Sequence, residues 1–234
     1  MPGYKLAHHK IIESALDNFN AEFFQANNII FGGGTRIALE LDEYRESIDI
    51  DFLCPDRDSY RAVRDETTNV SLGNLVKKPF EYPREILFDR YAVRPWIKYK
   101  STPIKLEFVS FDNYAIGFDL DPELFPVPFL DRPSCFYTKL LANADRKLVE
   151  PYKDIFDLLA MRSAWGQIPE KTIQAAEKHY QVVPSLIKAL EDIVNDEDKY
   201  FRAAGQVKMK PNWAEDIIKT QAKILLEEAK RYRR

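Results

Sequence analysis

Residues 32–52 read GGGTRIALELDEYRESIDIDF and contain the pattern that decides the fold. Its glycines follow a short apolar strand at Ile29–Phe31, and Thr35 is a suitable cap for a short helix over 36–41. The stretch ends on a strand, 47–52, in which apolar and polar residues alternate. A strand, a glycine turn, a helix and a second strand in this order predict the start of an α/β domain.

Asp49 and Asp51 lie on the polar face of the predicted strand, and Ser47 precedes them on that face. Two carboxylates at i and i+2 project a few ångströms apart, and such like charges repel strongly in a poorly solvated site unless a cation lies between them. The pair therefore predicts a Mg²⁺ site. The alternative is a solvated edge strand whose aspartates and Arg45 face water. Because aspartate is a poor strand former, the functional interpretation is favoured.

The glycine turn predicts a phosphate-binding site. Gly33 and Gly34 offer backbone N–H groups to phosphate oxygens without an obstructing side chain, and the positive end of the following helix favours the same anion.

Glu107 supplies a third carboxylate, on a strand predicted at 104–111 whose other face carries Leu106 and Phe108. Alone, an outward glutamate is usually just solvated. Beside an Asp-x-Asp strand, it can complete a two-metal site or accept a proton from an incoming hydroxyl.

The rest of the chain is predicted from periodicity. One amphipathic helix is expected over Tyr4–Gln25, and the proline-rich stretch Asp119–Pro133 is expected to be a surface linker. Beyond it the pattern is helical, with Ser134 as the first cap. The predicted helices are 134–146, 152–165, 170–179, 185–195 and 212 to the end. We expect an α/β domain of residues 1–130 and a helical domain of residues 131–234.

Composition excludes several classes of protein. The 234 residues contain 34 Lys+Arg and 37 Asp+Glu, and this near-neutral balance argues against a dedicated duplex-DNA binder. No apolar run approaches the ~20 residues that a bilayer span requires. The start, MPGYKLAHHK, has lysine and histidine where a signal peptide needs apolar residues, so a cytoplasmic location is expected. Neighbouring His8 and His9 point in different directions on a helix, which favours surface or capping roles over metal binding.

These motifs carry a resemblance to a known family. Gly33-Gly34-Thr35, an interval of thirteen residues, Asp49-x-Asp51 and the later Glu107 resemble the nucleotidyltransferase superfamily related to polymerase β. Residues 32–52 as a whole look like the AbiEii type of abortive-infection toxin, a branch of that superfamily. A second block resembles the helical motif that follows the catalytic domain in this branch: Lys139, Ala142, Asp145, Arg146 and Lys153-Asp154-x-x-Asp157-Leu158.

The resemblance implies an α+β fold, with a nucleotidyltransferase-like mixed sheet, flanking helices and a helical C-terminal domain. It implies that three carboxylates hold Mg²⁺ and act in catalysis, and that the glycine turn and helical basic residues bind the NTP. The implied metal ligands are Asp49, Asp51 and Glu107, and the implied NTP-binding residues are Gly33, Gly34, Thr35, Ser47, Lys139 and Arg146.

The charged residues of the helical block leave alternatives open. Lys139 and Arg146 lie two helical turns apart on one face, where they could instead form a solvated basic stripe. Lys153, Asp154 and Asp157 are expected to play supporting roles. Lys153 and Asp157 could equally be a surface i,i+4 ion pair, and Asp154 could orient Lys139 or Arg146.

The leading hypothesis is a Mg²⁺-dependent nucleotidyltransferase that moves an NMP from an NTP to a hydroxyl of RNA, such as tRNA, or of protein. The resemblance implies the toxin of a toxin–antitoxin or phage-defence system, with a separate antitoxin protein as partner. The alternatives are a nucleotide-binding protein without turnover that acts through a partner, and a small-molecule adenylyltransferase. The basic C-terminal sequence KRYRR could contact an RNA backbone, although such a tail is usually only solvated.

Overall fold

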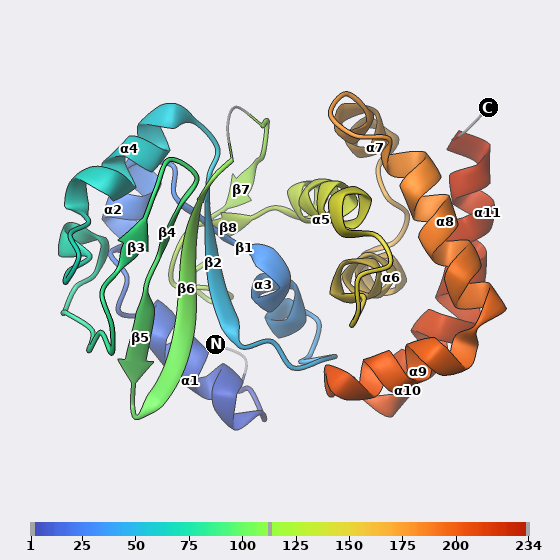
Figure 1. Ribbon diagram of the computed structural model, residues 1–234, viewed down its shortest axis with the longest axis horizontal. Coiled ribbons are helices and arrows are strands. Elements are labelled where there is room, and N and C mark those ends of the chain that lie inside the picture. Colours follow the sequence, from blue (N-terminus) through green and yellow to red (C-terminus); the bar gives the residue numbers. More distant parts are fainter. Residues whose placement is uncertain (1–2, 112–113, 233–234) are drawn as a thin grey trace. The chain divides into compact units, whose positions relative to one another are not determined.

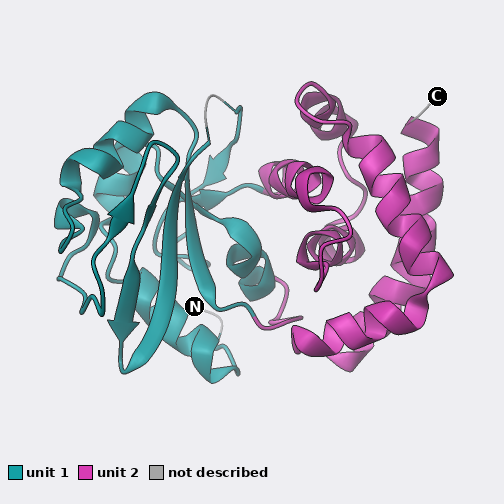
Figure 2. Ribbon diagram, in the orientation of Figure 1, with its two compact units in different colours: residues 1–40, 47–131 teal, residues 41–46, 132–234 magenta. Residues whose placement is uncertain are grey.

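The computed structural model describes residues 3–111 and 114–232 (Figure 1). The chain forms two compact units, which Figure 2 distinguishes by colour. Unit 1 comprises residues 1–40 and 47–131, and unit 2 comprises residues 41–46 and 132–234. The short segment 41–46 thus belongs to the helical unit, although it lies in sequence between a helix and a strand of unit 1. No pattern in the sequence predicted this excursion.

Unit 1 is built on one eight-stranded sheet in the order β3-β4-β6-β2-β1-β8-β7, with β5 also paired to β6. β2 runs parallel to β6 and β1 runs parallel to β8, whereas the other pairs are antiparallel. The strands are β1 (Ile30–Gly32), β2 (Asp49–Cys54), β3 (Leu87–Phe88), β4 (Ala92–Arg94), β5 (Trp96–Tyr99), β6 (Thr102–Ser110), β7 (Phe118–Asp119) and β8 (Phe129–Leu130). The expected mixed sheet is confirmed.

One face of this sheet carries the core of unit 1. The rings of Phe52 from β2 and Phe108 from β6 stack 5.0 Å apart, and Phe19 and Phe24 pack against Phe52. The covering helices are α1 (Ala7–Leu16), α2 (Ala21–Ala26), α4 (Arg57–Glu66) and the 3₁₀ turn η1 (Gly73–Leu75). Because the core residues alternate with Asp49, Asp51 and Glu107, those carboxylates lie on the opposite face. Figure 1 shows α3 (Gly33–Glu40) on that opposite side.

Several predicted boundaries in unit 1 were wrong. The helix expected over Tyr4–Gln25 is two helices, because the chain turns after α1 and the Asn20 side chain caps α2 by accepting from the Phe23 N–H. α3 begins at Gly33 rather than after Thr35, so Thr35 lies inside the helix and is not its cap. The stretch expected to be a linker contains β8, whose parallel pairing with β1 no local signal announces.

Unit 2 is helical, as expected. Its helices are α5 (Arg132–Arg146), α6 (Lys153–Trp165), α7 (Glu170–Glu177), α8 (Val182–Asn195), α9 (Glu197–Gln206), α10 (Pro211–Glu215), the π-helical turn η2 (Asp216–Gln221) and α11 (Ala222–Tyr232). α5 begins two residues before the expected Ser134 cap, with Pro133 in its first turn, where its missing N–H needs no helical partner. α9 was not predicted. It begins where the Asp196 side chain accepts from the Lys199 N–H.

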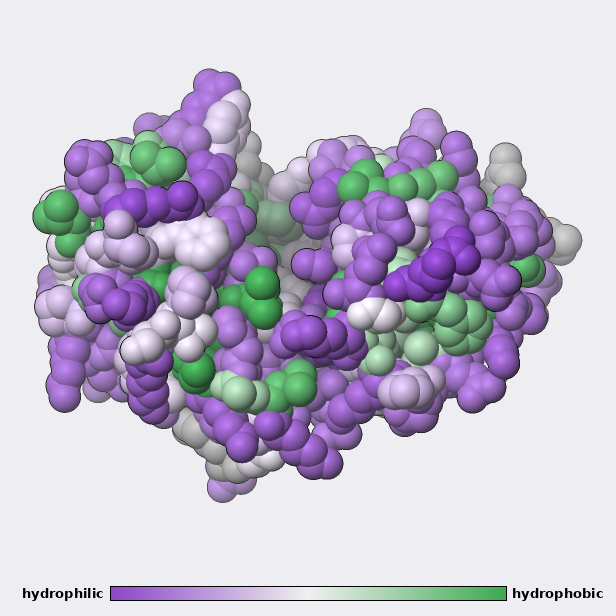
Figure 3. Space-filling view, turned by 60° about the horizontal axis from the view of Figure 1, so that its bottom comes forward, coloured by the Kyte–Doolittle hydropathy of each residue, from purple (hydrophilic) through white to green (hydrophobic). Residues whose placement is uncertain are grey.

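The visible surface is mostly hydrophilic (Figure 3), as expected for a chain with this many charged residues. Figure 3 shows hydrophilic side chains over most of the visible face, with hydrophobic residues in small separate groups. Within residues 3–111 and 114–232, no helix combines the length and the apolar character that crossing a bilayer requires.

Candidate active site

The glycine turn at the start of α3 lies directly against Asp51. Gly33 has φ +69°, a conformation that side chains rarely adopt. A Cβ built on Gly33 would lie 2.0 Å from Asp51 Oδ2. The register of β1 with β2 explains the proximity, because Gly32 is the partner of Asp51. Glycine at position 33 is therefore required both by the backbone conformation and by the Asp51 carboxylate.

Asp49 and Asp51 project from the same face of β2, and both are half-buried. Their neighbours Ile50 and Phe52 are fully buried on the other face, so the predicted alternation is present from Asp49 onward. Ile48, which was expected to share the apolar face, lies before the strand and is 48% exposed. No Lys or Arg side chain of the described residues forms an ion pair with the Asp49 carboxylate.

Glu107 is the β6 partner of Asp51 and lies on the same face of the sheet. Its carboxylate accepts from Arg94 Nε at 2.8 Å, and Lys105 Nζ lies 3.6 Å away. Arg94 and Lys105 were not singled out from the sequence. In the described part of the chain, no three His, Cys, Asp or Glu side chains gather closely enough to hold a metal ion. The two aspartates and the glutamate thus share a face, but the glutamate is engaged by cations.

The chain just before Asp49 is held by side chains from two helices. The Thr35 and Ser47 hydroxyls are hydrogen-bonded at 2.8 Å, and the Thr35 hydroxyl also donates to the Asp49 carbonyl. His9 Nε2 accepts from the Ser47 N–H at 3.0 Å. His8 Nε2 donates to the Ile48 carbonyl at 3.1 Å. The two histidines were expected to have surface or capping roles, and this use of them was missed.

Unit 2 contains a chain of paired charges, here called the ion network, formed by Arg45, Asp157, Lys139, Asp154 and Arg146. Arg45 donates to both Asp157 oxygens, from Nε at 2.9 Å and from Nη2 at 3.1 Å. Lys139 Nζ lies 2.6 Å from Asp157 Oδ2 and 2.9 Å from Asp154 Oδ1. Arg146 Nη2 donates to Asp154 Oδ2 at 2.9 Å. The Tyr44 hydroxyl also donates to Asp157.

The network is deeply buried at one end and exposed at the other. The side chains of Arg45 and Asp157 are 1% and 0% exposed, whereas that of Arg146 is 58% exposed. Lys139 is also buried, at 10% side-chain exposure. The suggested surface pair of Lys153 with Asp157 was therefore wrong, because Asp157 is enclosed and faces Arg45 and Lys139. Asp154 forms ion pairs with both Lys139 and Arg146, the two cations that one of the alternatives expected it to orient.

Burial and pairing act in opposite directions on the pKa values of the network. Burial alone would raise the pKa of Asp154, but Lys139 and Arg146 outweigh it and lower the pKa to about 2. Burial alone would lower the pKa of Lys139, but Asp154 and Asp157 raise it above its ordinary value. Both groups are therefore charged at neutral pH. Tyr44, whose pKa is raised first by burial, stays protonated.

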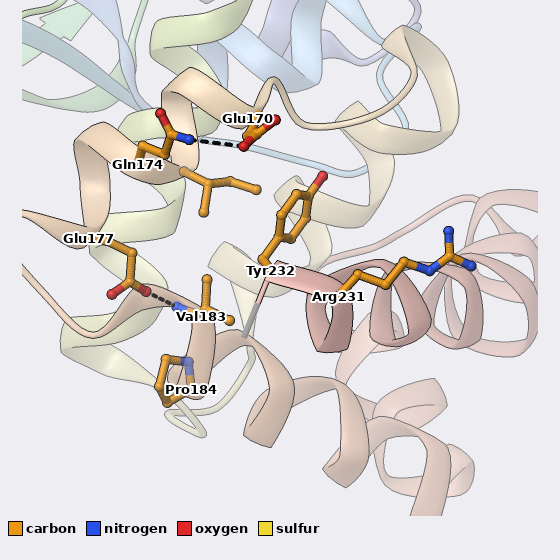
Figure 4. Close-up of a pocket in the computed structure, with 8 residues that line it drawn as sticks. Glu170, Gln174, Glu177, Val183, Pro184, Arg231 and Tyr232 are labelled. Atoms are coloured by element: carbon orange, nitrogen blue, oxygen red, sulfur yellow. Dashed lines mark hydrogen bonds between the residues drawn. The ribbon is translucent and has the colours of Figure 1, made fainter. Parts of the chain in front are cut away.

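Unit 2 also has a pocket that no motif predicted. It is lined by residues of α7, α8 and the end of α11, and Figure 4 shows its polar side chains. Glu170 accepts from Gln174 at 2.9 Å and Glu177 accepts from the Val183 N–H at 2.5 Å. Because both carboxylates have local structural partners, the pocket offers less to a reaction than the face of β2 that carries Asp49 and Asp51.

Solved structures show which class of fold this is. A candidate nucleotidyltransferase from H. pylori has a TM-score of 0.57 at 15% identity, covering 96% of this chain and 95% of its own. JHP933 from Helicobacter pylori has the same TM-score and identity, covering 98% of this chain and 96% of its own. At this identity the likeness shows the fold, which is that of the nucleotidyltransferases. No curated protein sequence matches the chain.

The family follows from the sequence as a whole. The model of the family described as nucleotidyl transferase AbiEii toxin, type IV TA system, matches residues 14–229. Because the match spans most of the chain, the protein belongs to the AbiEii family and is a nucleotidyltransferase. Membership in a type IV toxin–antitoxin family also implies an antitoxin.

Proposed function

We propose that the protein is a Mg²⁺-dependent toxin that moves an NMP from an NTP to a hydroxyl acceptor, with residues 1–130 as the catalytic domain and 131–234 as a helical domain. The observation that carries the proposal is the contact between the glycine turn and the aspartate strand, where a Cβ on Gly33 would meet the Asp51 carboxylate. Backbone N–H groups for phosphate and carboxylates for a divalent ion are thereby combined in one place.

Asp49 and Asp51 fit a divalent ion, because they present hard oxygen ligands from one strand face. When bound, the ion would neutralise charge on the phosphates and on the leaving pyrophosphate. Gly33, Gly34, Thr35 and Ser47 would bind the triphosphate. Glu107 would be a third ligand only after release from Arg94, or it would accept the proton of the acceptor hydroxyl.

In the proposed reaction, the acceptor oxygen forms a bond to the α-phosphorus and the bond from that phosphorus to the β-phosphate oxygen breaks. Pyrophosphate leaves, and the hydroxyl proton passes to Glu107. Arg146, with its exposed guanidinium, is the member of the ion network best suited to a phosphate. Lys139 would contribute mainly by orienting Asp154, which in turn holds Arg146, and Lys153 would support them from the start of α6.

RNA is the acceptor that the surface of unit 1 favours. Lys105 and Trp96 form a cross-strand row with Asp49. Next to it, Glu107, the partner of Asp51, is ion-paired with Arg94, whose own strand partner is Leu87. The Arg84 guanidinium lies over the Trp96 ring at 4.9 Å. Basic side chains with an aromatic ring, next to the carboxylates, suit the phosphates and bases of a single strand better than a protein hydroxyl. NTPs and RNA are substrates of the cytoplasm, where we expect the protein to act with its antitoxin partner.

The test is to incubate the purified protein and Mg²⁺ with each α-³²P NTP, and with either total RNA including tRNA or a protein extract. We expect labelled RNA, sensitive to ribonuclease and resistant to protease. Labelled protein would mean that the acceptor is a protein hydroxyl and not RNA. A labelled small molecule would support a small-molecule adenylyltransferase. Retention of NTP without any labelled product would support a nucleotide-binding protein without turnover.

A further inference from the structure

The two residues before β2 have hydrogen-bond partners outside the sheet. β2 begins at Asp49, so Ser47 and Ile48 lie outside the strand ladder. The backbone N–H of the half-buried Ser47 and the carbonyl of the exposed Ile48 are strong hydrogen-bonding groups that side chains can hold in place. Whatever pairs them also sets the direction in which the chain enters β2.

α1 supplies these partners through two adjacent side chains. His9 Nε2 accepts from the Ser47 N–H at 3.0 Å, and His8 Nε2 donates to the Ile48 carbonyl at 3.1 Å. His9 is fully buried, with the Tyr4 ring edge-on at a centroid distance of 6.4 Å. Because Nε2 accepts, the imidazole is neutral and carries its proton on Nδ1. The two hydrogen bonds hold the Glu46–Ser47 and the Ile48–Asp49 peptide groups, just before the first aspartate.

We propose that His9 is a positioning residue for Asp49, acting through Ser47 and assisted by His8. The inference rests on the proposed function of Asp49 as a metal ligand. His9 itself would contact neither the nucleotide nor the metal. It fixes the peptide two residues before Asp49, while Thr35 fixes the Asp49 carbonyl from the other side. With the backbone held at both points, the Cα–Cβ bond of Asp49 has a fixed direction, which limits the positions that its carboxylate oxygens can take.

The test compares His9→Leu with His9→Gln, whose amide oxygen can still accept a hydrogen bond. Mn²⁺ affinity is measured by electron paramagnetic resonance without NTP, and kcat and KM are measured by transfer of α-³²P label. Substitution of a residue that orients a metal ligand typically lowers metal affinity or activity by ~10-fold to 100-fold. For His9→Leu we expect Mn²⁺ binding about tenfold weaker, and a kcat loss larger than the rise in KM. His9→Gln should recover most of both.

Lys10→Ala, at the next and exposed position of α1, is the control and should match the wild type. If His9→Leu does not fold, His8→Ala tests the same peptide segment from a less buried side chain, with a smaller loss of Mn²⁺ affinity expected. Wild-type Mn²⁺ affinity in folded His9→Leu, or in His8→Ala when that variant replaces it, would overturn the proposal. So would a His9→Gln variant as impaired as His9→Leu. A wild-type protein that binds Mn²⁺ but transfers no label would contradict the proposed function instead, since metal affinity still tests the role of His9.

Discussion

The two units differ in whether their buried or half-buried carboxylates are paired with cations. On β2, Asp49 and Asp51 are half-buried on an otherwise apolar strand, and Asp49 has no cationic side chain paired with it among the described residues. In the ion network of unit 2, Asp157 is fully enclosed by Arg45 and Lys139. Asp157 is thus held by two cations of its own unit, whereas no cation of the described residues is paired with Asp49.

This difference teaches how to interpret charged motifs. A carboxylate with which no cation is paired, such as that of Asp49 among the described residues, is available for a ligand, and its removal should affect activity more than stability. A buried carboxylate between two cations is needed by those cations, and its removal leaves them desolvated and uncompensated. The same type of substitution should therefore have different consequences in the two units.

The largest effect is expected at β2. Asp49→Asn and Asp51→Asn should each lower nucleotidyl transfer by ~10³-fold or more, because a metal ligand that stabilises developing charge is lost. The thermal unfolding midpoint should change little. Label transfer from α-³²P NTP, with circular dichroism on the same samples, measures both. Two folded mutants with near wild-type transfer would remove the metal site from this strand.

Glu107→Gln is expected to come next, with a loss of ~10²-fold in kcat if this carboxylate accepts the proton. Since Glu107 is also paired with Arg94, unfolding should be measured alongside. Glu81→Gln is the matched control, because Glu81 pairs with Lys98 on the surface of the same unit. If the two variants turn over equally well, Glu107 has only the role of an ion-pair partner.

In unit 2, Asp157→Asn should act on stability. Leaving Arg45 and Lys139 without their shared carboxylate should cost about 3–5 kcal/mol of unfolding free energy, the usual penalty for a broken buried pair. Urea unfolding measures the change. Glu215→Gln breaks an exposed pair with Lys219 and should change the free energy by about 1 kcal/mol at most. Equal unfolding curves for the two variants would contradict the comparison.

Substitutions of the two α5 cations, Arg146 and Lys139, should affect different properties, the first NTP affinity and the second stability. Arg146→Ala should raise the KM for NTP by several-fold with little change in stability, because its side chain is largely exposed. Lys139→Met should destabilise the protein, since Asp154 and Asp157 lose their shared cation. Lys188→Ala, exposed on α8, serves as the control. An unchanged NTP affinity in Arg146→Ala would remove α5 from the proposed nucleotide site.

The smallest effect is a pH dependence. Because Lys139 and Arg146 hold the pKa of Asp154 near 2, below its ordinary value, its stabilising contribution is present above pH ~4 and is lost as the pH falls towards 2. The contribution is about 2 kcal/mol. Asp154→Asn should remove this part of the acid sensitivity, as thermal unfolding between pH 2 and 5 can measure. An identical pH dependence in the mutant would assign the sensitivity to other carboxylates.

How much of the fold and of the site can be predicted from the sequence depends on how far apart in sequence the interacting residues lie. The glycine turn, the Asp-x-Asp alternation and the helices of unit 2 follow local periodicity, and the structure contains them. β8 could not be predicted, because its pairing with β1 joins residues far apart in sequence. The partners of His9 and Arg45 are also distant in sequence, so an adjacent histidine pair and a lone arginine looked like surface residues. The roles assigned to the site residues stay predictions.

We propose above that nucleotidyl transfer takes place at the β2 aspartates and the glycine turn. The most direct measurement supplies one NTP with label either on the α- or on the γ-phosphate to the wild type, Asp51→Asn and the exposed control Asp58→Asn. Wild type and Asp58→Asn should attach the α-label to the acceptor and release the γ-label in pyrophosphate, and Asp51→Asn should do neither. Transfer of the γ-label to the acceptor, or α-label transfer by Asp51→Asn at the wild-type rate, would contradict this proposal.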